Sequence, residues 1–157
     1  MKSLATLIFT GSALCCAAAP AHAQKIDPAP PAITDAWVRT TVPGGTVSAA
    51  YMHIRSAKPL KLVKAESPVA GLVELHNMTM KDGVMAMKAM DAVDIPADKM
   101  VELKPGAMHV MLMMVKQPIK TGDKVPLILT FEAADKKPVV IKLDAVAQEK
   151  GPSGHMH

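Results

Sequence analysis

Short apolar segments, broken at regular intervals by turn-forming residues, are the feature that most constrains the fold of this chain. Five breaks contain proline or glycine: Pro43-Gly44-Gly45, Lys58-Pro59, Lys81-Asp82-Gly83, Pro105-Gly106 and Thr121-Gly122-Asp123. Segments of this kind that recur about every ten residues are typical of an antiparallel sandwich or barrel. No segment carries a sustained helical period, so the pattern predicts an all-β fold.

The apolar segments give a map of expected strands. We expect strands near residues 33–39, 47–55, 60–66, 70–78, 84–93, 99–103, 108–115, 125–132 and 138–146. At 157 residues the chain is long enough for one domain rather than two. We therefore expect a single Greek-key β-sandwich or barrel domain over residues 33–146.

The segments outside this domain have other compositions. Residues 1–23 resemble an export signal, because Lys2 precedes an apolar run and Ala21-His22-Ala23 is a small-x-small cleavage site. The run is too short to span a bilayer, and no later run is long enough. We expect a mature protein that starts at Gln24 and lies outside the cytoplasm, without a membrane span. A proline-rich lead-in at 24–32 and a flexible polar tail at 147–157 would flank the domain.

The two cysteines, Cys15 and Cys16, both lie within the expected signal. The residues before them, Ser12-Ala13-Leu14 and Ala13-Leu14-Cys15, fit a lipid-attachment motif poorly. After cleavage no thiol would remain, so the mature chain would have neither a disulfide nor a thiolate ligand. Export to an oxidising compartment is consistent with this.

Charge excludes some classes of function. The formal net charge of +4 falls to +3 without Lys2, and the lysines are scattered. No basic run is interleaved with aromatic residues, so we expect no nucleic-acid partner. No nucleophile and base are spaced for covalent catalysis, so we expect no enzymatic activity.

Two His-x-Met units stand out against this background. They are His76-Asn77-Met78 and His109-Val110-Met111, with Met87 between them. Because strand side chains alternate between faces, each unit would present its histidine and methionine on one face. In the second unit we expect Met108, Val110, Leu112 and Met114 to face the core and His109, Met111 and Met113 to face away from it.

Imidazole combined with thioether is a ligand set that suits Cu(I). Zinc sites prefer thiolate, imidazole and carboxylate, and calcium or magnesium needs oxygen ligands. A blue-copper site needs a cysteine thiolate, and no haem-attachment motif is present. The candidate Cu(I) ligands are His76, Met87, His109 and Met111, with Met78 as a possible secondary ligand.

Other readings of these residues remain open. Ten of the thirteen methionines lie from Met78 to Met114, and methionine is a common filler of hydrophobic cores. His53 is most simply structural. His155 and His157 end the chain, either as an ordinary disordered tail or as a secondary site for Cu(II), which imidazole nitrogens suit.

The spacing of the four candidate ligands resembles that of a known family. The periplasmic copper chaperones called PCuAC have the signature His-x10-Met-x21-His-x-Met. The chain matches this signature without a gap at His76, Met87, His109 and Met111. The stretches Pro43–Met52 and Leu103–Gly106 also resemble the family, and the resemblance covers roughly residues 33–146.

The resemblance implies a cupredoxin-like β-sandwich that binds Cu(I). It implies delivery of copper to the CuA centre of cytochrome c oxidase, so the expected partner is an oxidase subunit or another copper chaperone, and we expect a monomer. Some members carry a His- and Met-rich extension that binds Cu(II), here reduced to Gly154–His157. Two alternatives stay open: a periplasmic copper storage or resistance protein, and a non-metal exported interaction module with a methionine-rich core.

Overall fold

The computed structural model describes residues 30–81 and 83–150. Within these residues the fold is all-β, without a helix, and the expected fold class is confirmed. The strands, in chain order, are β1 (Ala32–Arg39), β2 (Val47–Arg55), β3 (Leu60–Glu66), β4 (Ala70–Lys81), β5 (Val84–Met90), β6 (Val93–Ile95), β7 (Met100–Leu103), β8 (His109–Val115), β9 (Lys124–Ala133) and β10 (Pro138–Gln148).

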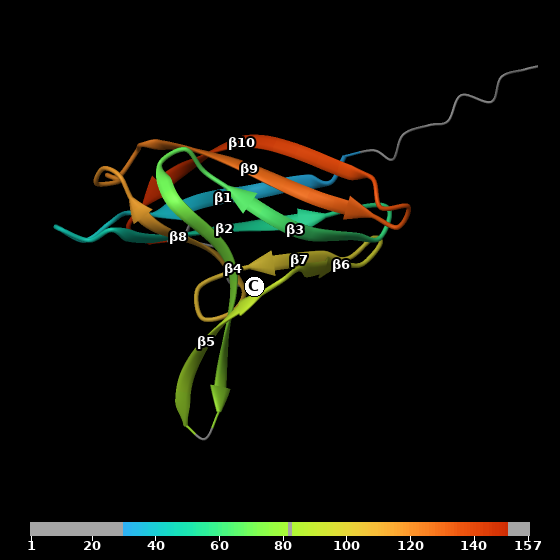
Figure 1. Cartoon of the computed structure of the whole chain (residues 1–157), viewed down its shortest axis with the longest axis horizontal. Coiled ribbons are helices and arrows are strands. Elements are labelled where there is room, and N and C mark those ends of the chain that lie inside the picture. Colours follow the sequence, from blue (N-terminus) through green and yellow to red (C-terminus); the bar gives the residue numbers. More distant parts are fainter. Residues whose placement is uncertain (1–29, 82, 151–157) are drawn as a thin grey trace, which may run out of the picture.

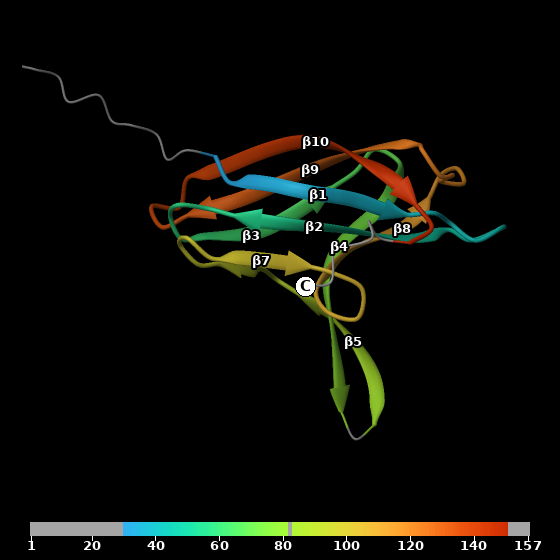
Figure 2. The same ribbon diagram turned by 180° about the vertical axis from the view of Figure 1, so that it is seen from behind.

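The strands form a cupredoxin-like β-sandwich. Hydrogen bonds connect them in the order β5-β4-β8-β2-β1-β10-β9-β3-β6, with β7 joined to β2. The pairing of β1 with β10 is parallel, and the other strand pairs are antiparallel. The sheet folds back on itself at β10 and so forms two layers. Strands β9 and β3 lie in front of β1 and β2 in Figure 1 and behind them in Figure 2.

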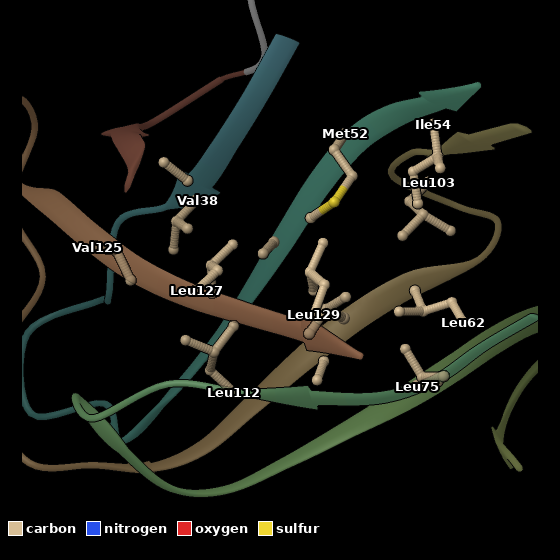
Figure 3. Packing of buried hydrophobic residues seen from close by; sticks show 14 of the residues in the cluster. Val38, Met52, Ile54, Leu62, Leu75, Leu103, Leu112, Val125, Leu127 and Leu129 are labelled. Carbon is tan, nitrogen blue, oxygen red and sulfur yellow. The ribbon is translucent and has the colours of Figure 1, made fainter. Parts of the chain in front are cut away.

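The core fills the space between the two layers. Leu127 and Leu129 of β9 are fully buried and lie opposite Met52 of β2 and Leu112 of β8, as Figure 3 shows. Burial of each such side chain contributes about 1.5–3 kcal/mol relative to exposure. A one-residue slip of β8 would expose Val110 and Leu112, so packing fixes which side chains of this strand face away from the core.

Strand β4 is longer than the strand that supports it. Its first part pairs with β8 up to His76, and pairing with β5 runs from Leu75 to Lys81. The β4–β5 hairpin therefore projects from the sandwich, as Figures 1 and 2 show, with β5 at the end of the sheet path.

Several expected boundaries need correction. The expected strand 84–93 is two strands, because the chain leaves the edge of β4 after Met90 and β6 pairs with β3 instead. Strand β4 runs to Lys81 rather than to residue 78, since the hairpin continues the ladder. Strand β10 ends at Gln148, two residues into the expected tail.

The expected core face of β8 is wrong at Met114. Its φ is 52°, and 58% of its surface is exposed, whereas Val115 is buried. The left-handed backbone turns Met114 outward and places the next residue in the core, a local irregularity that alternation cannot predict.

The two expected terminal segments lie mainly outside the described residues. These are the signal at 1–23 and the end of the tail at 151–157, together with most of the lead-in. In the part of the chain that the structure describes, there is no helix long and apolar enough to cross a membrane.

Candidate metal centre

Strands β4 and β8 place the two histidines side by side. His76 is the direct cross-strand partner of His109, and the centroids of their rings are 6.0 Å apart. Directly opposed residues of an antiparallel pair have side chains on the same face. The two His-x-Met units therefore meet at their histidines, although 32 residues separate these in the chain.

The two candidate methionine ligands lie on opposite sides of this pair. Met111 is opposite Glu74, two residues before His76 on β4, and Met87 is opposite Met78, two residues after it. With about 3.4 Å per residue and about 4.8 Å between strands, the Cα atoms of Met87 and Met111 would be about 17 Å apart in a flat sheet. All four residues share one face, but both thioethers reach one ion only if the hairpin curls towards β8.

The ring of His109 is oriented by the backbone beside it. Its Nδ1 lies 2.9 Å from the carbonyl oxygen of Ala107, to which it donates a hydrogen bond. In the neutral ring this leaves the lone pair on Nε2. The residue is only 4% exposed, so its orientation is also fixed by packing.

The ring of His76 is oriented by a carboxylate. Its Nε2 lies 2.9 Å from Oε2 of Glu74, the acceptor two residues earlier on the same face. With Nε2 donating, the neutral ring has its lone pair on Nδ1, which is buried without a hydrogen-bond partner. An unsatisfied buried polar atom costs about 1–3 kcal/mol. A bound cation would satisfy this nitrogen.

An aromatic pair extends the face beyond His109. The centroid of the Tyr51 ring is 6.2 Å from that of His109, and Trp37 lies against Tyr51 at 4.4 Å. Burial raises the pKa of Tyr51, and the nearby Arg39 opposes this effect only in part. The phenol therefore stays neutral and supports the ring of His109 without offering an anionic ligand.

Exposure differs between the two kinds of candidate ligand. The imidazoles are largely buried, with 13% of the His76 side chain exposed, whereas Met87 is 47% exposed. Within residues 30–81 and 83–150, no three His, Cys, Asp or Glu side chains gather closely enough to hold a metal ion. The thioethers on the face of the two histidines are therefore the candidates for further ligands.

The other residues considered from the sequence differ in their position relative to the site. Met78 lies on the same face as His76, opposite Met87. His53 is outside the site and pairs with Asp35, with 3.0 Å between Nδ1 and Oδ2. His155 and His157 lie outside the described residues.

Two parts of the site have no signal in the amino-acid sequence. Tyr51 lies beside His109 because of the register between β2 and β8, which no sequence motif reveals. The carbonyl of Ala107 carries no side-chain signal at all. By contrast, Glu74 is predictable from the sequence as an acceptor for His76, since residues two apart on a strand share a face, and the two side chains are in contact.

The fold and the paired histidines define a β-sandwich protein with a candidate imidazole–thioether metal centre. Comparison with known proteins identifies the family. Residues 31–143 match the family model described as "LpqE-like: Putative lipoprotein LpqE-like", and the chain belongs to this family.

Individual relatives agree with this assignment. A protein of Leifsonia xyli subsp. xyli described as "Putative lipoprotein Lxx21020" is 30% identical over 110 residues, which are 69% of this chain. The chain spans 66% of the length of that curated relative.

Solved structures of PCuAC domains have the same fold. The apo PCuAC domain from PmoF1 superposes with a TM-score of 0.61 at 23% identity, covering 79% of this chain and 98% of that domain. The solution structure of CuI-DR1885 from Deinococcus radiodurans superposes with a TM-score of 0.54 at 30% identity, covering 82% of this chain and 83% of that one.

Proposed function

We propose that this protein is an exported carrier of Cu(I). The ion is bound by His76, His109, Met87 and Met111 and is passed to a copper-accepting protein. The observation that carries the proposal is the cross-strand pair of histidines, each with one ring nitrogen hydrogen-bonded and the other available.

The orientation of the rings supports ligand roles for both histidines. Metal-binding histidines usually donate their second ring N–H to a carboxylate or a backbone carbonyl, which fixes the tautomer and the ring direction. Glu74 does this for His76, and the carbonyl of Ala107 does it for His109. The available nitrogens are then Nδ1 of His76 and Nε2 of His109.

The donor set supports a soft monovalent ion. Neutral imidazoles and thioethers leave the single positive charge of Cu(I) in place, and the carboxylate next to His76 partly offsets that charge. Thioethers select Cu(I) over the harder divalent ions. The neighbour CuI-DR1885, whose title names the Cu(I) form, supports the same ion.

The open arrangement of the thioethers supports transfer rather than permanent retention. Met87 lies on a projecting hairpin and is half exposed, so it can leave the ion without disturbing the buried core. An incoming ligand of a partner protein would replace it by exchange. The recipient that we propose is the CuA centre of cytochrome c oxidase, or another copper chaperone that supplies it.

The proposed compartment is the periplasm. Its support is the export signal expected at residues 1–23 and the lipoprotein description of the family. That description reopens Cys15 and Cys16 as lipid-attachment sites, although their sequence context fits poorly. Mass spectrometry of the mature N-terminus would distinguish a chain that begins at Gln24 from a lipidated one.

An anaerobic competition titration with a chromophoric Cu(I) chelator tests the binding site. We expect His76→Ala and His109→Ala each to lower the affinity at least tenfold, a loss of about 1.4 kcal/mol or more. His53→Ala is the matched control, because this histidine lies outside the site. Equal affinities for all three variants would refute the site.

Delivery is tested separately from binding. Cytochrome c oxidase activity should fall in a deletion strain grown at low copper and should recover with the wild-type gene or with added copper. The His109→Ala gene should fail to restore activity at low copper. Oxidase activity that is independent of the gene, together with intact Cu(I) binding and lower copper tolerance of the strain, would favour a storage or resistance role.

A further inference from the structure

Four methionines share one face of the β4–β5 hairpin. Met78 is the cross-strand partner of Met87, and Met80 is the cross-strand partner of Met85. Because residues two apart on a strand face the same way, both pairs lie on the face that carries His76. We call Met78, Met80, Met85 and Met87 the methionine ladder.

Core packing does not account for these side chains. Met80 is 69% exposed, Met85 is 48% exposed, and Met87 is 47% exposed. The hairpin that carries these residues projects from the sandwich in both views of the molecule (Figures 1 and 2). Side chains as exposed as these contribute less burial energy than core side chains do.

The opposite face of the hairpin shows that methionine is not a general filler of these strands. Between the rungs of the ladder, Asn77 is paired with Lys88, and Thr79 is paired with Ala86. These two pairs are polar or small, whereas Leu75 and Met90 are paired where that face meets the core, and Val84 is paired with Lys81 at the far end. Beyond Met90, the thioethers of the hairpin all lie on the face that carries His76.

The spacing within each rung suits a single ion. Directly opposed residues have Cβ atoms about 4.5–5.5 Å apart, and the flexible methionine side chain can bring two sulfurs of a rung onto one ion. Thioethers are soft, neutral donors that select Cu(I). We propose that the methionine ladder is a second, all-thioether binding site for Cu(I), centred on Met80 and Met85 and completed by Met78.

The ladder is continuous with the histidine pair. Successive rungs lie two residues apart, or about 7 Å at about 3.4 Å per residue. Met87 belongs to the ladder and is also a proposed ligand of the ion held at His76 and His109. The second site rests on the proposed function, because it would bind the same ion on the same face of the sheet. Its ligands Met80 and Met85 are not ligands of the first site.

Silver(I) and Cu(I) titrations of the purified protein test the proposal. Both ions are diamagnetic, so NMR of protein labelled with 13C at the methionine methyl groups follows each thioether. We expect a first equivalent that shifts the signal of Met111 and the imidazole signals, and a second, weaker equivalent that shifts Met80 and Met85. The double variant Met80→Leu/Met85→Leu should lose the second equivalent and keep the first with its affinity unchanged within about twofold.

A matched control uses exposed methionines outside the ladder. Met100 and Met114 are 55% and 58% exposed, so Met100→Leu/Met114→Leu removes two accessible thioethers without touching the hairpin. This control should retain both equivalents. The proposal is overturned if the wild-type protein takes up one equivalent only, if the second equivalent survives in the ladder variant, or if the control loses it as well.

The NMR shifts distinguish the absence of the second site from the absence of the site at the two histidines. His109→Ala should abolish the imidazole shifts while Met80 and Met85 still respond to Ag(I). Ladder shifts in a wild-type protein without imidazole shifts would refute the proposed function and leave the second site standing. Imidazole shifts without ladder shifts would refute the second site alone.

Discussion

At the scale of single residues, each of the two histidines has one ring nitrogen in a hydrogen bond that orients the ring and one that is available to a metal ion. Nε2 of His76 is hydrogen-bonded to Glu74, and Nδ1 of His109 is hydrogen-bonded to the carbonyl of Ala107. The other nitrogen of each ring keeps a lone pair in the neutral form. Because Glu74 carries a negative charge and a backbone carbonyl does not, the two histidines are expected to respond differently to mutation of their surroundings.

The first prediction concerns Glu74. Glu74→Ala should lower Cu(I) affinity about tenfold or more, because it removes both the acceptor that orients His76 and the charge that offsets the cation. Glu102→Ala is the control, since Glu102 also bonds a residue two positions away but lies on β7. Competition titration measures the Cu(I) affinity of both variants, and equal affinities of Glu74→Ala and Glu102→Ala would exclude a role for Glu74.

The second prediction concerns pH. A histidine must be neutral to bind a metal, so protons compete with Cu(I) for both rings. Acidification favours the protonated imidazoles, and the Cu(I) affinity should therefore fall as the pH is lowered from neutral into the mildly acid range. Competition titrations across this range measure the effect, and a flat profile would indicate binding by methionine alone.

At the scale of elements, β8 both supports the core and carries half of the site. Val110 and Leu112 are fully buried, which holds His109 and Met111 on the other face. The strand then departs from regular geometry at Met114, where φ is positive. A Cβ atom added at Gly71 of β4 would lie 3.1 Å from Cβ of Met114, so the glycine accommodates this irregularity.

The third prediction tests the coupling between these two positions. Gly71→Ala should destabilise the fold by about 1 kcal/mol, because Cβ of Met114 is anchored to the backbone and cannot move aside freely. Met114→Gly relieves the left-handed strain, which costs roughly 1–2 kcal/mol in a residue with a side chain, and it also removes the close contact. Urea unfolding of the single and double variants should show that Met114→Gly rescues Gly71→Ala, whereas strictly additive effects would contradict the coupling.

At the scale of the whole molecule, most of the architecture was predictable because turn-forming residues bound the apolar segments, and because burial alternates regularly along strands such as β9 and β10. The bounds of β2 and β3 match the expected residues, and the turns fall at the expected proline and glycine positions. The split into β5 and β6 was not predictable, because the pairing of a strand depends on residues that are far away in the sequence. The left-handed residue in β8 was missed because methionine gives no signal for it.

The sequence alone proposes the candidate residues of the site but not their geometry. Alternation places each His-x-Met unit on one face, and the spacing matched a known signature. Neither feature shows that His76 and His109 are direct partners, or that Met87 and Met111 lie on opposite sides of them, because register between distant strands is a tertiary property. The candidate ligands also differ in accessibility, since His109 is buried and Met87 is exposed.

The fourth prediction concerns the C-terminal residues beyond the described fold. His155 and His157 offer nitrogen donors that suit Cu(II), whereas the thioethers of the sandwich suit Cu(I). Deletion of residues 151–157 should therefore reduce Cu(II) binding and leave Cu(I) binding unchanged. Spectroscopic titrations of the full and shortened proteins measure this, and identical Cu(II) curves would exclude a site on the tail.

X-ray absorption of the protein loaded anaerobically with one equivalent of Cu(I) tests the central claim most directly. The account predicts a Cu(I) edge with two kinds of neighbour in the first shell: nitrogen with the outer scattering of imidazole rings, and sulfur from thioethers. The imidazole scattering should decrease in His109→Ala, and the sulfur shell should decrease in Met111→Leu. A shell of sulfur alone, or of nitrogen and oxygen without sulfur, would contradict a site built from His76, His109, Met87 and Met111.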